Sequence, residues 1–379
     1  MATPHIETIP LLQMASGDLI SLQVYRYSGD RSGKKAYLQA NLHGAEIAGN
    51  VVIHRLMDWL GSLAADAIAG EIWLVPVCNP LGVNARTHHF PTGRYSPYEG
   101  DDWNRIFWDY EKTGGEIAAL PGDAAAVVKQ YRAQILEAFK AEQAKLDQPQ
   151  GISLEQRYRT VLQSLALDAD YVIDLHSSSN RGLTYLYYFP GREAGARLFS
   201  LDFGILLDEY DGDAFDESFI KPWLALERAN AAAGQPLRCE VEAYTLEIGT
   251  GMKVDPLATE KSLRGVQHYL VEKGLIHRAS APPGLVPEAA PGTVGNMALH
   301  SRQQVHKYYT TQGGVLQNRV EPAATVTPGT VLYELVRFNK SGKMPAIQTV
   351  RSQHSGFIYD VSSSEVMNQG EYVLSLIAT

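Results

Sequence analysis

The chain has 379 residues, of which 45% are hydrophobic and 20% charged, and its formal net charge is −9. This length favours two domains over one core, and the negative charge argues against nucleic acid and anionic membrane surfaces as partners. The sequence contains no run of about 18 apolar residues that would span a membrane, and its beginning lacks the pattern of a secretory signal. We therefore expect a cytoplasmic protein with neither nucleic-acid nor membrane partners.

Apolar strand-like runs alternate with helical stretches over roughly the first 280 residues. The segment 18–41 predicts a hairpin, because turn-forming residues lie at 28–30 and 32–33. Further along the chain, strands are predicted at 35–41, 71–80, 169–176 and 242–249, and helices at about 46–63, 123–147, 153–166 and 258–276. This alternation predicts an α/β domain with a mostly parallel or mixed sheet.

The composition changes near residue 279. Residues 279–293 are rich in Pro, Ala and Gly, and short strand-like runs with frequent turns follow them. We place the domains at 1–282 and 283–379, the second a small all-β domain. The helical insertion at about 115–166 is a candidate lid or a contact in a homo-oligomer, and the sequence favours neither.

One short stretch, Ala40 to Ile47, places a histidine and a carboxylate where a strand gives way to a helix. His43 and Glu46 are spaced i, i+3, so they face the same side if the turn is helical. Imidazole and carboxylate are suitable zinc ligands, and a catalytic zinc usually takes three protein ligands. His176 follows another strand, and the carboxyl ends of strands are where ligands gather in open α/β sheets. Asp174 would then orient that imidazole.

Taken alone, the H-x-x-E pattern is a weak signal, because Glu46 would also favour the start of a helix and His176 could be a core histidine. Other polar residues strengthen the metal hypothesis. Asn79 ends a strand, Asn104 and Arg105 form a polar pair, and Glu247 lies in an otherwise apolar strand. Burying a carboxylate there costs several kcal/mol unless its charge is used or paired.

Five motifs occur in an order that resembles the succinylglutamate desuccinylase/aspartoacylase family of the zinc carboxypeptidase-like clan. They are H-x-x-E at 43–46, N-P-x-G at 79–82 with a downstream Arg86, D-x-N-R-x-F at 102–107, the strand-end His176, and T-x-E-x-G at 245–249. The resemblance covers about residues 35–275. It implies a mixed-sheet α/β/α catalytic domain, and the C-terminal domain resembles the hammerhead barrels found in other members.

The resemblance also implies a role for each residue. His43, Glu46 and His176 would bind one Zn²⁺ per chain. Arg86 would polarise the scissile carbonyl, and Glu247 would be the general base that deprotonates the attacking water.

Substrate binding would fall to a different set of residues. The residues expected to hold the substrate are Asn79, Asn104 and Arg105, since a guanidinium suits a carboxylate.

The implied function is zinc-dependent hydrolysis of the amide bond of an N-acyl amino acid or a similar small carboxylate. Here 18 residues separate Arg86 from Arg105, which departs from the family pattern and leaves the substrate open. A metallocarboxypeptidase or amidase acting on short peptides, and an esterase, would use the same chemistry. A catalytically inactive ligand-binding member is the non-enzymatic alternative, and the presence of Glu247 argues against it.

Overall fold

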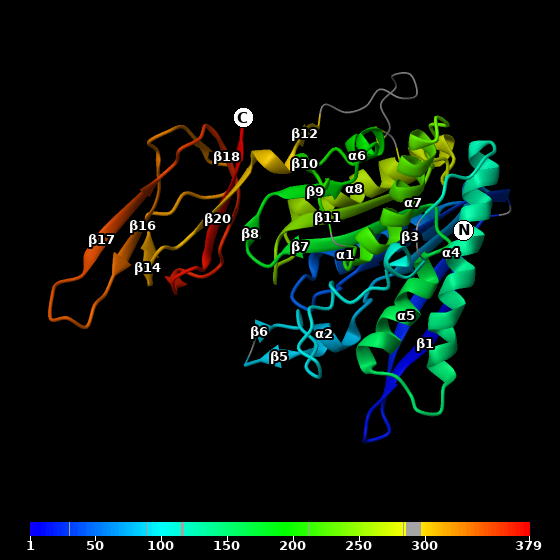
Figure 1. Cartoon of the computed structure of the whole chain (residues 1–379), viewed down its shortest axis with the longest axis horizontal. Coiled ribbons are helices and arrows are strands. Elements are labelled where there is room, and N and C mark those ends of the chain that lie inside the picture. The colour runs from blue at the N-terminus through cyan, green and yellow to red at the C-terminus, as the bar shows by residue number, and fades with distance from the viewer. Residues whose placement is uncertain (30, 89, 115–116, 211, 283, 286–296) are drawn as a thin grey trace.

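The computed structural model describes residues 1–29, 31–88, 90–114, 117–210, 212–282, 284–285 and 297–379. It has an α/β domain built on a large mixed sheet, followed by a domain of antiparallel β-sheets (Figure 1). None of the helices within these residues combines the length and apolarity needed to cross a membrane. The fold class is the one expected from the alternation of strands and helices.

The large sheet has nine strands in the order β1-β2-β4-β3-β7-β11-β9-β10-β12. β3 runs parallel to β4 and β7, and β7 runs parallel to β11, whereas β9 is antiparallel to β11. The strands are β1 (His5–Gln13), β2 (Leu19–Ser28), β3 (Arg31–Ala40), β4 (Ala69–Val75), β7 (Tyr171–Ser178), β9 (Thr184–Tyr188), β10 (Phe203–Leu206), β11 (Glu242–Thr250) and β12 (Ala298–His300).

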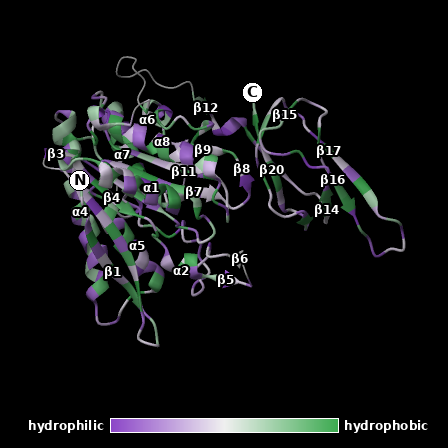
Figure 2. Ribbon diagram, turned by 180° about the vertical axis from the view of Figure 1, so that it is seen from behind, coloured by the Kyte–Doolittle hydropathy of each residue, from purple (hydrophilic) through white to green (hydrophobic). Residues whose placement is uncertain are grey.

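Helices cover both faces of this sheet, because side chains of a buried strand alternate between two cores. In β3, Leu38 belongs to one core and Tyr37 to the other. The first core is covered by α1 (Ala48–Ser62), α6 (Glu193–Leu198) and α8 (Pro256–Glu272), and the second by α4 (Ala124–Ala144), α5 (Leu154–Ala166) and α7 (Phe215–Ala232). Figure 2 shows hydrophobic and hydrophilic residues on these same helices, as expected for helices that bury one face.

Most predicted elements are confirmed to within a few residues. The helix expected at 123–147 is α4 followed by a 3₁₀ turn (Lys145–Asp147), and α4 and α5 fill the expected helical insertion. The hairpin predicted within 18–41 is wrong, because β2 pairs with β1 and β4 and not with β3. β4 lies between them in the sheet, and this long-range pairing buries β3 at the centre of the domain.

The C-terminal domain consists of two small sheets. One has the order β13-β20-β18-β15, from β13 (Val305–Tyr309), β20 (Tyr372–Ala378), β18 (Gly356–Val361) and β15 (Thr325–Val326). The other has the order β17-β16-β14-β19, from β17 (Ala346–Arg351), β16 (Val331–Arg337), β14 (Gly314–Gln317) and β19 (Val366–Met367).

Two strand pairings connect the segments on either side of the expected domain boundary. The boundary at 282/283 and most of the predicted linker lie outside the described residues. After them, β12 pairs with β10 in the large sheet. In return, β8 (Arg181–Gly182) of the α/β domain pairs with β18 of the C-terminal domain.

Three glycines allow close backbone contact beside the strand end of β3. The Gly44 amide donates to the Gly93 carbonyl at 3.0 Å. Gly82 lies in α2 (Pro80–Asn84), between these two segments, and a Cβ added to Gly44 would come within 2.0 Å of its carbonyl oxygen. Only glycine therefore fits at position 44, which follows His43 directly.

We expect the Gly44→Ala variant to lose about 1–3 kcal/mol of unfolding free energy, because the added methyl group must push two backbones apart. Gly61→Ala is the matched control. Gly61 lies in α1 with no atom within 4 Å of an added Cβ, so alanine should stabilise that helix by about 1 kcal/mol. Urea denaturation of both variants measures the difference, and equal stabilities would contradict the packing argument.

Candidate metal centre

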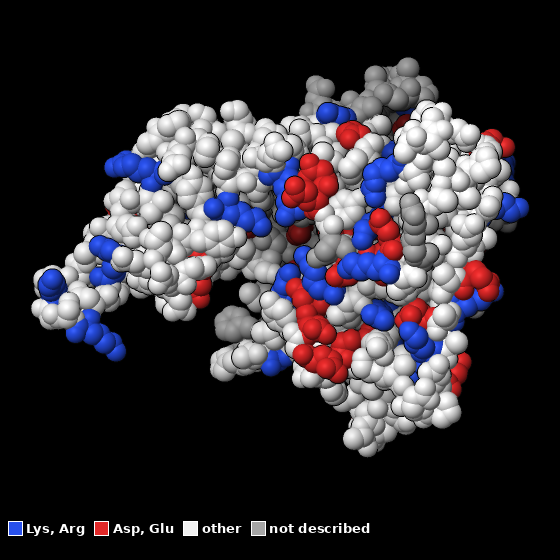
Figure 3. All heavy atoms as spheres, in the orientation of Figure 1, with Lys and Arg blue, Asp and Glu red and all other residues white. Residues whose placement is uncertain are grey.

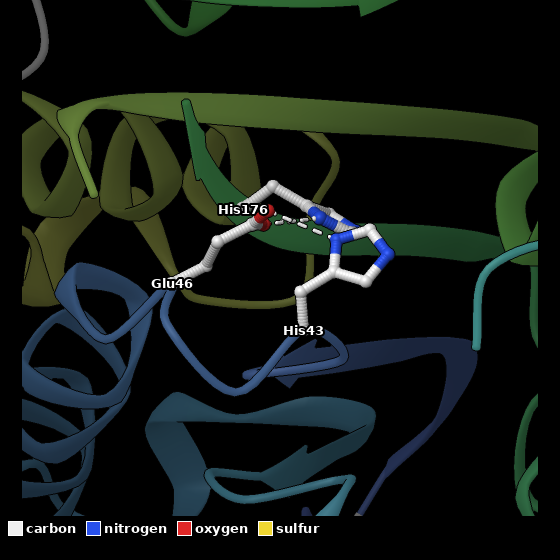
Figure 4. A group of neighbouring side chains, drawn as sticks. All are labelled: His43, Glu46 and His176. Atoms are coloured by element: carbon white, nitrogen blue, oxygen red, sulfur yellow. Dashed lines mark hydrogen bonds and ion pairs between the residues drawn. The ribbon is translucent and has the colours of Figure 1, made fainter. Parts of the chain in front are cut away.

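His43, Glu46 and His176 converge on one point (Figure 4). The Glu46 carboxylate lies between the two imidazoles, with Oε1 2.9 Å from His43 Nδ1 and Oε2 2.8 Å from His176 Nδ1. All three side chains are buried, and one ligand atom from each lies within 4.8 Å of the others. The structure thus brings together the three residues predicted as metal ligands.

The turn that carries His43 and Glu46 is fixed by polar contacts of its own backbone. The Glu46 amide donates to the His43 carbonyl, so the i, i+3 pair closes a turn before α1 begins. Asn41 directly follows β3 and has a φ of 69°, a conformation that asparagine tolerates better than most residues. Its side-chain amide donates to the His43 carbonyl at 3.0 Å. This conformation turns the chain sharply from the strand into the ligand-bearing turn.

A further carboxylate faces the far nitrogen of each imidazole. His43 Nε2 lies 2.9 Å from Asp102 Oδ1, and His176 Nε2 lies 3.0 Å from Asp174 Oδ2. The contact to Asp174 was predicted from the spacing of alternate strand residues. A carboxylate on the far nitrogen leaves Nδ1 of each ring for a metal and makes the imidazole a better ligand.

Negative charge dominates this cluster. Burial lowers the pKa of both imidazoles, but for His176 the charges of Asp174 and Glu46 outweigh it and raise the pKa well above the ordinary value. The pKa of His43 is raised for the same reason, by Glu46 and Asp102. For Glu46, burial raises the pKa, yet the two histidines bring it below its usual range.

The donor set fits a divalent cation such as Zn²⁺. Asp174 is fully buried, and neither of its oxygens has an aligned hydrogen-bond donor in the described part of the chain. This carboxylate needs a positive charge close by, and in the metal-free protein the raised pKa of His176, 3.0 Å from Asp174 Oδ2, supplies one as a proton. A cation on the Nδ1 atoms of His43 and His176 and on Glu46 would supply that charge, and two histidines with one carboxylate are a known zinc ligand set.

The cluster lies in a cavity of about 580 Å³ between the two domains. The C-terminal domain contributes Arg302, Val305, Lys307 and Tyr359 to its lining. Figure 3 shows acidic and basic side chains side by side where the two domains meet. A small molecule with both charged and polar groups would match this lining.

Glu247 also lines this cavity. Its neighbour across the parallel pair of β7 and β11 is His176, so both side chains leave the sheet on the same face. Its Oε2 atom is buried and has no hydrogen-bond partner among the described residues. Burial, followed by the charge of Glu46, raises the pKa of Glu247 to about 7. A carboxyl group poised near neutral pH is suited to proton transfer.

The arginine that reaches the cluster is Arg94. Its Nε lies 3.0 Å from Asp102 Oδ2, and its Nη1 lies 3.6 Å from Glu46 Oε1. Arg86 was expected here, but its exposed side chain turns back to the carbonyls of Val83 and Ala85. It begins a short hairpin of β5 (Arg86–Thr87) and β6 (Phe90–Pro91) and is not among the residues that line the cavity.

The three residues predicted to bind substrate have different positions. Asn104 and Arg105 line the cavity, although Asn104 Oδ1 already accepts from the amide of Phe215 at the start of α7. Asn79 is fully buried and does not line it. Its side chain caps α2 through the Gly82 amide and donates to the Leu42 carbonyl, next to His43. Asn79 therefore joins the start of α2 to the residue that precedes His43.

Sequence reasoning missed Arg94, Asp102 and Asn41 in this centre. Arg94 and Asp102 face each other because the chain between them folds back, with a β-bridge between Tyr95 and Asp102. The order D-D-W-N-R marked Asp102 as part of a motif, which was a usable signal. For Asn41 the signal was an asparagine at a strand end before a glycine-containing turn.

Comparisons with known proteins agree with this geometry. The family model of the succinylglutamate desuccinylase/aspartoacylase catalytic domain matches residues 32–272. A comparison with curated proteins gave no significant match.

Several solved structures are similar over almost the whole chain. One from Shewanella frigidimarina NCIMB 400, provisionally named a succinylglutamate desuccinylase/aspartoacylase, is 25% identical with a TM-score of 0.84, covering 100% of this chain and 98% of that one. A protein provisionally assigned to the same family from Shewanella amazonensis SB2B is 26% identical with a TM-score of 0.82 and covers 98% of both chains.

A more distant structure shares the fold. The product-bound ectoine utilization protein EutE (DoeB) from Ruegeria pomeroyi is 16% identical with a TM-score of 0.65, covering 100% of this chain and 95% of that one. The family model spans well over half of the chain, including all three converging ligands and Glu247. The chain therefore belongs to the succinylglutamate desuccinylase/aspartoacylase family.

Proposed function

We propose that this protein is a zinc-dependent hydrolase that cleaves the amide bond of an N-acyl amino acid or a similar small carboxylate. The observation that carries the proposal is the pair of imidazoles sharing Glu46, each with a carboxylate on its far nitrogen. Beside them lies Glu247, whose Oε2 has no hydrogen-bond partner among the described residues. When bound, Zn²⁺ supplies a Lewis acid that activates water and polarises a carbonyl group. His43, Glu46 and His176 would hold it.

Glu247 acts as the general base in this scheme. It takes a proton from the attacking water as the carbon–oxygen bond forms, and it delivers the proton to the amide nitrogen as the carbon–nitrogen bond breaks. Glu247 is then a carboxylate again, and the products are a carboxylic acid and an amine, which become a carboxylate and an ammonium group when the acid proton passes to the amine. The raised pKa of Glu247 supports this role, because the group exchanges protons near neutral pH.

Arg94 takes the role that was expected of Arg86. Its guanidinium lies close to both Glu46 and Asp102 and lines the cavity, so it can stabilise negative charge on the carbonyl oxygen. Arg105 lines the same cavity and carries a planar guanidinium suited to a substrate carboxylate. Asn104 and Arg105 together bind that carboxylate.

A substrate panel tests this proposal against its alternatives. Zinc-loaded protein is assayed with N-acyl amino acids, short peptides with free carboxyl ends, and esters of the same acids. We expect the highest kcat/KM for an N-acyl amino acid. A preference for peptides would favour a metallocarboxypeptidase, and stoichiometric zinc without turnover of any compound would favour a ligand-binding protein.

We expect Glu247→Gln to keep about one zinc per chain and to lower kcat by about 10²–10⁴-fold, because glutamine cannot accept the proton. Glu240→Gln is the control, since Glu240 lies just before β11 and does not line the cavity. Metal analysis and steady-state kinetics on both variants measure the effect. Near-normal activity of the Glu247 variant would remove it as the base.

We expect Arg94→Ala to lower kcat by about 10²–10³-fold, the usual effect of losing one group that stabilises the oxyanion. Arg86→Ala should change kcat little, because the Arg86 side chain points to local carbonyls. Zinc content is measured in both variants, so that a loss of metal is separated from a loss of charge. A larger loss of kcat in Arg86→Ala than in Arg94→Ala would assign the role to Arg86.

We expect the metal-free protein to become less stable as the pH rises. The folded protein raises the pKa of Glu247 from its ordinary 4.5 to about 7, and it raises the pKa of His43 and His176 above 6.5. The folded state then holds protons that the unfolded state releases, so the free energy of unfolding falls from about pH 4.5 upward. Zinc binding needs unprotonated imidazoles, so zinc should stabilise the protein more at high pH.

Urea denaturation between pH 5.5 and 8.5, with chelator and with zinc, measures both trends. The gap between zinc-loaded and metal-free protein should widen with pH. Metal-free protein that becomes more stable over this range would contradict the assigned charges.

A further inference from the structure

The segment that follows His176 contacts Glu46 on one side and the C-terminal domain on the other. β7 ends within this segment, at Ser178. The Ser177 backbone amide lies 3.4 Å from Glu46 Oε2, and the Ser179 hydroxyl lies 3.5 Å from Glu46 Oε1. The side chains of Ser178 and Asn180 reach Asp360, a residue of the C-terminal domain.

Asp360 is a buried carboxylate whose donors come from both domains. From the α/β domain, the Ser178 hydroxyl donates at 2.5 Å and the side-chain amide of Asn180 at 3.1 Å. From its own domain, the Tyr372 hydroxyl donates at 2.6 Å. The backbone agrees, because Asp360 in β18 is the register partner of Gly182 in β8. Asp360 is 5% exposed, so water does little to weaken these bonds.

We infer that Asp360 of the C-terminal domain is a positioning residue for the metal centre, acting through residues 177–180. It holds the outer side of this segment while the inner side contacts Glu46, the ligand shared by both histidines. The C-terminal domain thereby sets the position of His176 and Glu46. The inference rests on the proposed function, because that function supplies the metal. The contacts of residues 177–180 are present without a metal.

The test compares Asp360→Ala with Glu321→Gln in the full-length protein. Glu321 forms another ion pair between the domains, with Arg181, but does not contact residues 177–180. It therefore controls for a general weakening of domain contact. Asp360→Asn keeps an oxygen that can accept from Ser178 and serves if the alanine variant does not fold.

The first measurement is hydrogen exchange of metal-free protein, followed on a peptide that contains residues 177–180. Asp360→Ala should exchange faster there than wild type, and Glu321→Gln should not. This result needs neither metal nor activity, so it tests the inference even if the proposed function fails. Unchanged protection in Asp360→Ala, or an equal loss in Glu321→Gln, would overturn it.

The second measurement is a titration with Co²⁺ followed by its visible absorption bands, which report the ligand geometry. Asp360→Ala should bind Co²⁺ about 10–100-fold more weakly than wild type, with altered bands, as for other residues that orient ligands. Asp360→Asn should recover part of this loss, and Glu321→Gln should match wild type. Wild-type affinity and bands in Asp360→Ala would overturn the inference, whereas wild type that binds no Co²⁺ would overturn the proposed function.

A double-mutant cycle gives the last check. Ser178→Ala/Asn180→Ala should weaken Co²⁺ binding as much as Asp360→Ala does, because both remove the same contact. Combining all three substitutions should add little further loss. Losses that add fully would mean that Asp360 acts by another route and would overturn the inference.

Discussion

The carboxylate of Glu46 is shared by two buried imidazoles, and much of the catalytic domain is arranged so that this sharing is possible. A buried carboxylate is costly unless charge and hydrogen bonds compensate it. One imidazole comes from the turn after β3 and the other from the end of β7, so these neighbouring parallel strands must end at the same edge of the sheet. The centre therefore depends on the strand order, which only long-range pairing fixes.

The same charges also explain how the loops near the site are placed. Asp102 and Asp174 each face the far side of a histidine, and Arg94 lies between Asp102 and Glu46. The loop with Arg94 comes close to the turn with His43 because glycines at both positions leave room for the backbone of α2. Backbone packing thus brings the positive guanidinium to a cluster that carries an excess of negative charge.

Local sequence patterns predicted the strands and the turn that carry the residues of the cluster. The apolar runs that became β3, β7 and β11 are short and bounded by turn residues, and the spacing of His43 and Glu46 depends on a single turn. Such signals are contained within a few residues, so sequence alone can reveal them. The pairing of β2 with β4 could not be predicted in this way, because the two strands are far apart in the sequence and no local pattern records which strands pair.

The choice between Arg86 and Arg94 shows a second limit. Both follow the N-P-x-G motif, and the resemblance to the family assigned the role to Arg86. A two-strand hairpin turns Arg86 toward its own backbone, while a fold-back of the following loop brings Arg94 to the cluster. Loop conformation of this kind is set by contacts with the rest of the protein, which spacing does not record.

The bond between Ser178 and Asp360 spans 182 residues and has a consequence for how the protein is made. During synthesis, His43, Glu46 and His176 leave the ribosome long before β18 does. Contacts of such high sequence separation form late in folding, because closing a long loop costs entropy before the contact rewards it. A nascent chain thus holds all three residues of the cluster while one wall of their cavity is still missing. The cavity around the cluster is complete only when the strands that follow residue 300 have docked.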